Sequence, residues 1–268
     1  MSEHGDIYVA DHKKGDVVLL DDAGRWIRSI AGFTAPLGVA VFEAPPLFDC
    51  PEFIDETYTQ KCNGKTFLFV GDKGDGSVQL LIERTKAGVL GIGSGEFIMP
   101  NGIAVTQDLT IYVVDSLANQ VMVYDSSGVQ QAVFGSAGFN FPTDIALNEA
   151  EGELYITDFH NRRIRVFDLD GGWLRDIFAP LNDQGDPVFW KPAGIGIDSE
   201  GNLYIVDNGL SCVAKISSGG ELLHTIGYSD GQYWTGELSI PVDAAVYGTH
   251  VYVTSNGQRE LRIFEVVP

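Results

Sequence analysis

A short strand motif, in which an aromatic residue stands three positions before a closing Asp or Ser, occurs six times in this chain of 268 residues. The best-preserved copy lies in residues 141–168, FPTDIALNEAEGELYITDFHNRRIRVFD. Its three runs of β-branched and aromatic residues are separated by Pro, Gly, Asp and Asn, a pattern typical of short strands joined by tight turns. No helical spacing interrupts it. The six copies close at Asp11, Asp72, Asp115, Asp158, Asp207 and Ser255.

The residues around the motif repeat as well. A branched aliphatic residue follows each closing residue by six positions, and a Pro turn precedes five of the copies. In four copies a further apolar segment follows a turn, at residues 25–30, 129–134, 173–177 and 221–226. Four antiparallel strands repeated six times predict an all-β chain that folds as one six-bladed β-propeller domain over residues 1–268.

Two departures from the repeat carry predictions of their own. Residues 43–64 are an insertion between the first and second strands of blade two, which places them on the face opposite to the presumed ligand face. The first copy begins at its second strand and the last ends after its third. We therefore expect three-stranded blades at both ends of the chain, and a trimmed or processed N-terminus.

The blades resemble NHL repeats, whose pattern runs Pro-x-Asp/Gly-Ile-Ala, then Gly-x-Leu-Tyr-Val-x-Asp, then Asn-x-Arg-Ile-x-Val-Phe. Residues 141–168 match this pattern almost fully, including Asn161 and Arg163, whereas the other copies replace the Arg. The resemblance covers essentially the whole chain and implies the same propeller fold. Propellers of this family serve as protein-binding platforms, RNA-binding modules, sensors and enzymes, so the resemblance leaves the function open.

Charge narrows the choice of partner. The chain has 37 acidic residues against 17 basic ones, a formal net charge of −20. Such a surface repels phosphate backbones and disfavours nucleic-acid binding. No apolar run is long enough for a membrane span. We expect a monomer whose partner is a protein, a peptide or a small molecule.

The three cysteines bear on the compartment. Cys50 and Cys62 lie in one polar loop, where they either form a local disulfide or remain two free thiols. The disulfide would favour an extracytoplasmic location. Cys212 stands at a strand start, where burial is expected.

Aromatic residues mark the segments that lead into blades five and six. Both segments belong to the presumed ligand face. Two interpretations stay open, recognition of a ligand or partner and packing between the blades. The candidate contact residues are Phe189, Trp190, Tyr233 and Trp234.

Three oxygen donors follow Pro turns and form the candidate metal site, Asn101, Asp144 and Asp243. Calcium or another divalent cation would suit converging oxygens of this kind. The turn at residues 100–104 also resembles gluconolactonase/regucalcin-like propellers, in which such an Asn holds a catalytic divalent metal. The match departs at Ala193 and Val242, where that family needs an acid. The alternative is that Asp144 and Asp243 cap their own turns.

No recognised catalytic arrangement accompanies these residues. The sequence has no Ser-His-Asp order and no phosphate loop, and its histidines do not reproduce the zinc site of amidating-lyase propellers. The closing Asp series is interpreted as structural, because each carboxylate stands where it can accept backbone N–H groups across a loop. We expect a non-catalytic binding scaffold. The alternative is a metal-dependent lactonase, hydrolase or lyase-like enzyme.

Overall fold

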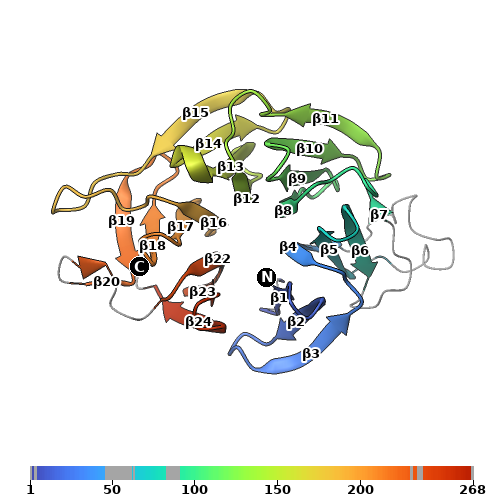
Figure 1. Ribbon diagram of the computed structural model, residues 1–268, viewed down its shortest axis with the longest axis horizontal. Helices are drawn as coiled ribbons and strands as arrows, with labels where there is room; N and C mark the ends of the chain where they lie inside the picture. The colour runs from blue at the N-terminus through green and yellow to red at the C-terminus, as the bar shows by residue number, and fades with distance from the viewer. Residues whose placement is uncertain are drawn as a thin grey trace. The chain divides into compact units, whose positions relative to one another are not determined.

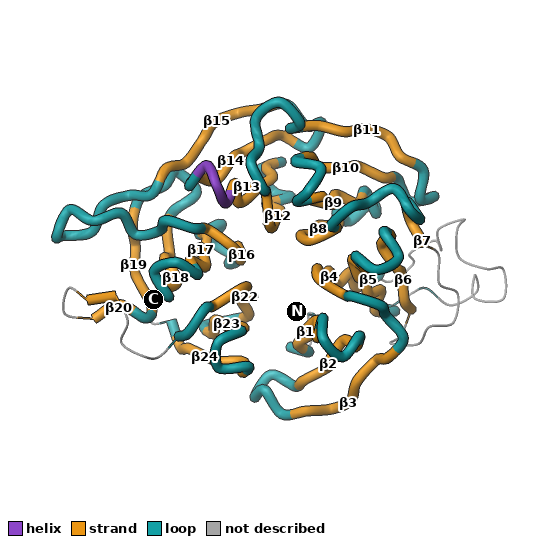
Figure 2. Tube along the Cα trace, viewed as in Figure 1, coloured by secondary structure: helices purple, strands orange, loops and turns teal. Residues whose placement is uncertain are grey.

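The computed structural model describes residues 2, 5–45, 62, 64–82, 91–229, 232–233 and 238–266. The fold is a six-bladed β-propeller of antiparallel blades, as the repeat predicts. Within the described ranges the one helical element is a 3-10 turn, η1 (Phe159–Asn161) (Figure 2). The chain forms two compact units, Met1–Gly138 (unit 1) and Phe139–Pro268 (unit 2). Each unit contributes three blades.

Unit 1 holds blades one to three, the blue to green strands of Figure 1. Blade one is β1 (Ile7–Asp11), β2 (Asp16–Leu20) and β3 (Trp26–Ala31). Blade two is β4 (Pro36–Glu43), β5 (Thr66–Asp72), β6 (Ser77–Ile82) and β7 (Gly91–Ile92). Blade three is β8 (Pro100–Val105), β9 (Ile111–Asp115), β10 (Gln120–Tyr124) and β11 (Gln130–Phe134).

Unit 2 holds blades four to six, and a two-residue strand pair precedes blade six. Blade four is β12 (Pro142–Asn148), β13 (Glu153–Asp158), β14 (Arg163–Asp168) and β15 (Trp173–Phe178). Blade five is β16 (Pro192–Ile197), β17 (Leu203–Asp207), β18 (Cys212–Ile216) and β19 (Leu222–Ile226). The short pair is β20 (Tyr228–Ser229) and β21 (Gln232–Tyr233), and blade six is β22 (Pro241–Tyr247), β23 (His250–Ser255) and β24 (Glu260–Glu265).

The cores lie between neighbouring blades within each unit. Both faces of a second strand are covered, so β9 and β17 are buried at every position. This explains their nearly continuous apolar sequences, since sheets that pack face to face bury both surfaces of an inner strand. The repeated aromatic residue fills these layers, and Tyr112, Tyr155 and Tyr204 expose at most 2% of their surface.

The described residues confirm the three-stranded blades at both ends of the repeat, β1–β3 and β22–β24. The insertion joins β4 to β5, as predicted, although most of residues 43–64 lies outside the described ranges. Cys62 lies within the described ranges and is disulfide-bonded. Cys50, its predicted partner, lies outside them. Cys212 is buried and free. No helix in the described part of the chain is long and apolar enough to cross a membrane.

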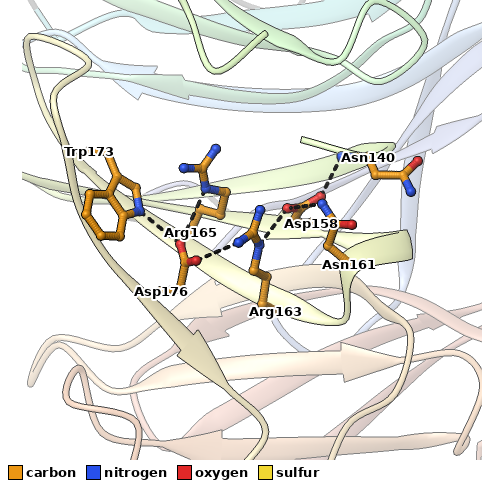
Figure 3. Close-up of polar contacts among 7 residues, drawn as sticks. All are labelled: Asn140, Asp158, Asn161, Arg163, Arg165, Trp173 and Asp176. Atoms are coloured by element: carbon orange, nitrogen blue, oxygen red, sulfur yellow. Dashed lines mark hydrogen bonds and ion pairs between the residues drawn. The ribbon is translucent and has the colours of Figure 1, made fainter. Parts of the chain in front are cut away.

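The closing Asp residues are structural. Asp158 is fully buried and accepts hydrogen bonds from the backbone N–H of Asn140 at 2.8 Å and from the Nε of Arg163 at 2.9 Å. Arg163 also pairs with Asp176 at 2.6 Å, which accepts from the indole N–H of Trp173 (Figure 3). Asn161 of the repeat pattern also donates to Asp158, at 2.9 Å. Arg163 of the pattern therefore ties the second strand of blade four to its outer strand, and Asn161 holds the loop that follows the second strand.

Candidate functional site

In unit 2, strand pairing places one set of loops at a common end of the blades. Pro142 pairs with Asp158 and Asp158 with Arg163, and blades five and six repeat the arrangement. The starts of the inner strands and the loops between second and third strands are thus neighbours. We call this surface the loop face. It comprises residues 139–141, 159–162, 189–191, 208–211, 239–240 and 256–259.

Trp190 is the most distinctive residue of the loop face. Its side chain is 41% exposed, and the guanidinium carbon of Arg162 lies 3.4 Å from the centroid of its ring. A guanidinium over an indole is a favourable cation–π arrangement. Asp207 fixes the backbone beneath, because its carboxylate accepts the N–H groups of Trp190 and Lys191. The contact therefore joins a loop of blade four to the strand start of blade five.

A second aromatic group belongs to the loop face of blade four. The ring of His160 lies 5.4 Å from that of Phe141 and 5.0 Å from that of Phe159, centroid to centroid. Phe141 and Phe159 also meet edge to face, with their centroids 6.1 Å apart. The loop face of blade four is thus a rigid aromatic surface with an exposed imidazole.

The predicted aromatic contacts divide between core and surface. Phe189 is 1% exposed and packs in the core with Val188 and Ile195, which is the arrangement that the packing interpretation describes. Tyr233 lies in β21, and Trp234 lies outside the described residues. Sequence reasoning missed Arg162. The Arg162–Arg163 pair was the available signal, because the repeat pattern uses only the second Arg.

Asp144 and Asp243, two of the predicted metal ligands, are brought together in unit 2. Asp144 accepts the N–H groups of Ile145 and Ile195, both at 2.9 Å. Asp243 accepts the N–H of Ala244 at 2.7 Å. Gly194 lies in β16, between β12 with Asp144 and β22 with Asp243. A Cβ built on Gly194 would lie 2.8 Å from Oδ1 of Asp243. The carboxylates therefore cap the starts of three neighbouring inner strands.

The pKa values of both carboxyl groups are raised. Burial, followed by the charge of Asp243, raises the pKa of Asp144 well above its ordinary value. Burial also raises the pKa of Asp243, although its hydrogen bond with Asp144 acts in the opposite direction. Like charges this close disfavour ionisation of both groups.

Replacement of Asp243 by Asn should make the thermal stability of the protein less sensitive to pH. A carboxyl whose pKa is raised on folding stabilises the fold below its unfolded pKa, and that contribution is lost as pH rises through the folded pKa. The wild-type melting temperature should therefore fall from about pH 4 towards neutral pH. D243N keeps the acceptor for Ala244 and removes one charge, so its melting temperature at pH 7 should exceed that of the wild type. Equal slopes in the two proteins would contradict the raised pKa values of this pair.

Asn101, the third predicted ligand, belongs to unit 1. Its Nδ2 donates to the hydroxyl of Ser116 at 3.0 Å, so this side chain turns towards the end of the neighbouring strand. Both oxygens of Asp144 already accept backbone N–H groups, which leaves each oxygen one further lone pair. Across the described ranges no group of three or more His, Cys, Asp or Glu residues is arranged to hold a metal. The residues do not form a ready-made ligand set, and the calcium site stays a prediction.

The pattern of the NHL repeat matches residues 139–167, the segment that runs from the loop face of blade four to the end of β14. The chain carries an NHL repeat. This confirms the resemblance seen in the sequence. The matched segment contains Asp158, His160 and Arg162.

Two curated proteins resemble the chain over part of its length. Protein brain tumor of Drosophila melanogaster is 24% identical over 157 residues, which cover 56% of this chain and 14% of that protein. Probable peptidyl-alpha-hydroxyglycine alpha-amidating lyase pgal-1 of Caenorhabditis elegans is 26% identical over 176 residues, 62% of this chain and 47% of that protein. The chain spans less than half the length of either relative.

Solved structures share the propeller fold. A structure titled "Crystal structure of Nidogen/Laminin Complex" has a TM-score of 0.69 at 19% identity and covers 94% of this chain and 87% of its own. A streptogramin B lyase structure has a TM-score of 0.64 at 15% identity and covers 100% of this chain and 81% of its own. At these identities the likeness extends to the fold alone.

Proposed function

We propose that this NHL-repeat propeller is a binding scaffold and that the loop face of unit 2 is its contact surface. The observation that carries the proposal is the exposed indole of Trp190 under the guanidinium of Arg162. Trp and Arg are the residues that dominate binding energy at protein interfaces. Both are held in place here, Trp190 by the carboxylate of Asp207 and Arg162 by the ring that it covers.

Exposed apolar residues at the start of blade six support a protein or peptide ligand. Ile240 and Val242 expose 49% and 42% of their surface next to the start of β22. Apolar side chains beside aromatic and basic ones are the composition of an interface centre. The rigid strand starts beneath them limit the ordering cost of association.

Replacement of Trp190 by Ala should weaken ligand binding by about 2 kcal/mol or more, which is a hot-spot effect. Trp173 provides a matched control, because it is 56% exposed but lies on the outer strand of blade four. W173A should leave binding unchanged. The measurement is the affinity of both variants and the wild type for peptides selected on the wild-type protein. Equal affinities for W190A and wild type would refute the assignment of the loop face.

A metal-dependent reaction remains a separate prediction that nothing in the site favours. Calcium bound through Asn101, Asp144 and Asp243 should raise the melting temperature of the wild type, and D243N should abolish that shift. An unchanged melting temperature in excess calcium would remove the metal and the lactonase- or lyase-like alternative that depends on it.

A further inference from the structure

Basic side chains on unit 2 are distributed unevenly. Residues 139–268 contain eight Lys and Arg residues. Five of them form ion pairs on the strands, namely Arg163, Arg165, Arg175, Lys215 and Arg262. Within the described residues the other three have no acidic partner, and all three are exposed on the loop face, Arg162, Lys191 and Arg259.

The opposite ends of the same blades are acidic. In blades four and five the turns between first and second strands and between third and fourth strands carry Glu and Asp and no Lys or Arg, whereas the first turn of blade six, residues 248–249, is uncharged. The segments that make up the loop face contain no Asp or Glu, although the connection from β15 to β16 at the same end of the blades carries the exposed Asp183 and Asp186. In a chain with a formal net charge of −20, solvation alone does not explain why the cations without an acidic partner lie on one face. The acidic turn residues are Glu149, Glu151, Asp168, Asp170, Asp198, Glu200 and Glu221.

The backbone at two of these cations adds an independent observation. The residue before each third strand has a positive φ, and blades one to three place Gly15, Gly76 and Asn119 there. Gly and Asn adopt this left-handed conformation at the lowest cost. Blade five places Ser211 (φ 58°) there, and blades four and six place Arg162 (φ 58°) and Arg259 (φ 56°). Arginine thus occupies two positions where the first three blades use residues better suited to this backbone.

We infer that the loop face of unit 2 binds an acidic segment of a partner protein, with Asp or Glu side chains next to apolar ones. This inference rests on the proposed function and names its ligand. Arg162, Lys191 and Arg259 supply the charge complement, and charge-assisted hydrogen bonds from guanidinium to carboxylate are among the strongest that proteins make. Trp190, Ile240 and Val242 supply the apolar contacts.

The charges favour a protein segment over a nucleic acid. Binding to a nucleic-acid backbone gains affinity with each phosphate that a cation neutralises. The loop face offers three unpaired Lys or Arg side chains, while the acidic remainder of the molecule repels a long polyanion. A short acidic segment meets the cations and avoids the rest of the surface.

The test is selection of a phage-displayed library of random peptides on the wild-type protein, followed by affinity measurements on variants. The selected peptides should be enriched in Asp and Glu beside apolar residues. The double variant R162N/R259N should bind a selected peptide at least about tenfold more weakly, a change of about 1.4 kcal/mol. Its melting temperature should stay unchanged or rise, because Asn suits both backbone positions. Loss of binding without loss of stability separates contact from a structural role.

Arg25→Asn removes an exposed arginine, paired with Asp21, from a turn of blade one and should leave the affinity unchanged. Selection of neutral or basic peptides whose binding depends on Trp190 would contradict the inference of an acidic ligand. It would leave the proposal of a binding scaffold standing. A selection without any Trp190-dependent peptide would contradict both. A uridylate oligonucleotide that displaced the peptide at equal concentration would replace the acidic segment with a nucleic acid.

Discussion

Replacement of Asp207 by Ala is expected to destabilise the protein by about 4 kcal/mol, since each buried donor left unsatisfied costs about 1–3 kcal/mol. Its fully buried carboxylate accepts four backbone N–H groups. Alanine leaves these donors without an acceptor. The donors belong to Trp190, Lys191, Gly209 and Leu210.

The melting temperature of D207A should fall by roughly 10 °C, as measured by circular dichroism. D207N retains one acceptor oxygen and should lose about half as much. Asp168→Ala is the control, because that carboxylate caps the N–H of Gly172 in an exposed turn, and removal of such a cap costs about 1 kcal/mol. A loss for D207A as small as that of D168A would contradict the structural role of the closing Asp. Ligand binding should also weaken, because Asp207 positions Trp190.

Gly194→Ala is expected to cost about 3 kcal/mol, the upper end of the usual range for overpacking. A Cβ at this position would lie 2.6 Å from both the carbonyl oxygen of Val242 and the Cα of Asp243. Both are backbone atoms of β22 and cannot be moved by a change of side-chain rotamer, so β16 and β22 must move apart. Such a movement would also disturb the hydrogen bond between Ile195 and Asp144.

Gly185→Ala separates this steric effect from the general cost of replacing a glycine. Gly185 has a φ of 84° and no atom within 4 Å of a built Cβ, so its substitution should cost about 1 kcal/mol through backbone strain alone. Denaturant unfolding of both variants gives the comparison. Similar losses for G194A and G185A would show that the inner strands do not approach as closely as described.

The fold could be predicted from the sequence because its signals repeat. Each copy places an aromatic residue, a closing Asp and a branched aliphatic residue at fixed spacing, and these three become a core side chain, a loop cap and the next strand. The insertion at 43–64, the missing first strand of blade one and the missing fourth strand of blade six are visible as breaks in that spacing. Strand boundaries followed to within a residue or two, for example β15 at Trp173–Phe178 against the predicted 173–177.

The candidate site was less predictable, because exposure and pairing depend on packing between blades. Two neighbouring aromatic residues differ in burial, since Phe189 is 1% exposed and Trp190 is 41% exposed. The sequence identified Asp144 and Asp243 as oxygen donors, whereas their mutual contact and the backbone N–H groups that they accept come from the approach of β12, β16 and β22. Arg162 escaped notice because its partner, Trp190, lies on another blade.

Hydrogen–deuterium exchange of the protein, free and bound to a peptide selected on it, tests the loop face most directly. Binding should slow exchange at residues 159–162, 189–191 and 256–259, and W190A should abolish that protection. The acidic turns at residues 149–152 and 198–202, at the opposite end of the same blades, should exchange equally in both states. Protection confined to those turns, with the loop-face segments unchanged, would contradict the assignment of the loop face as the binding surface.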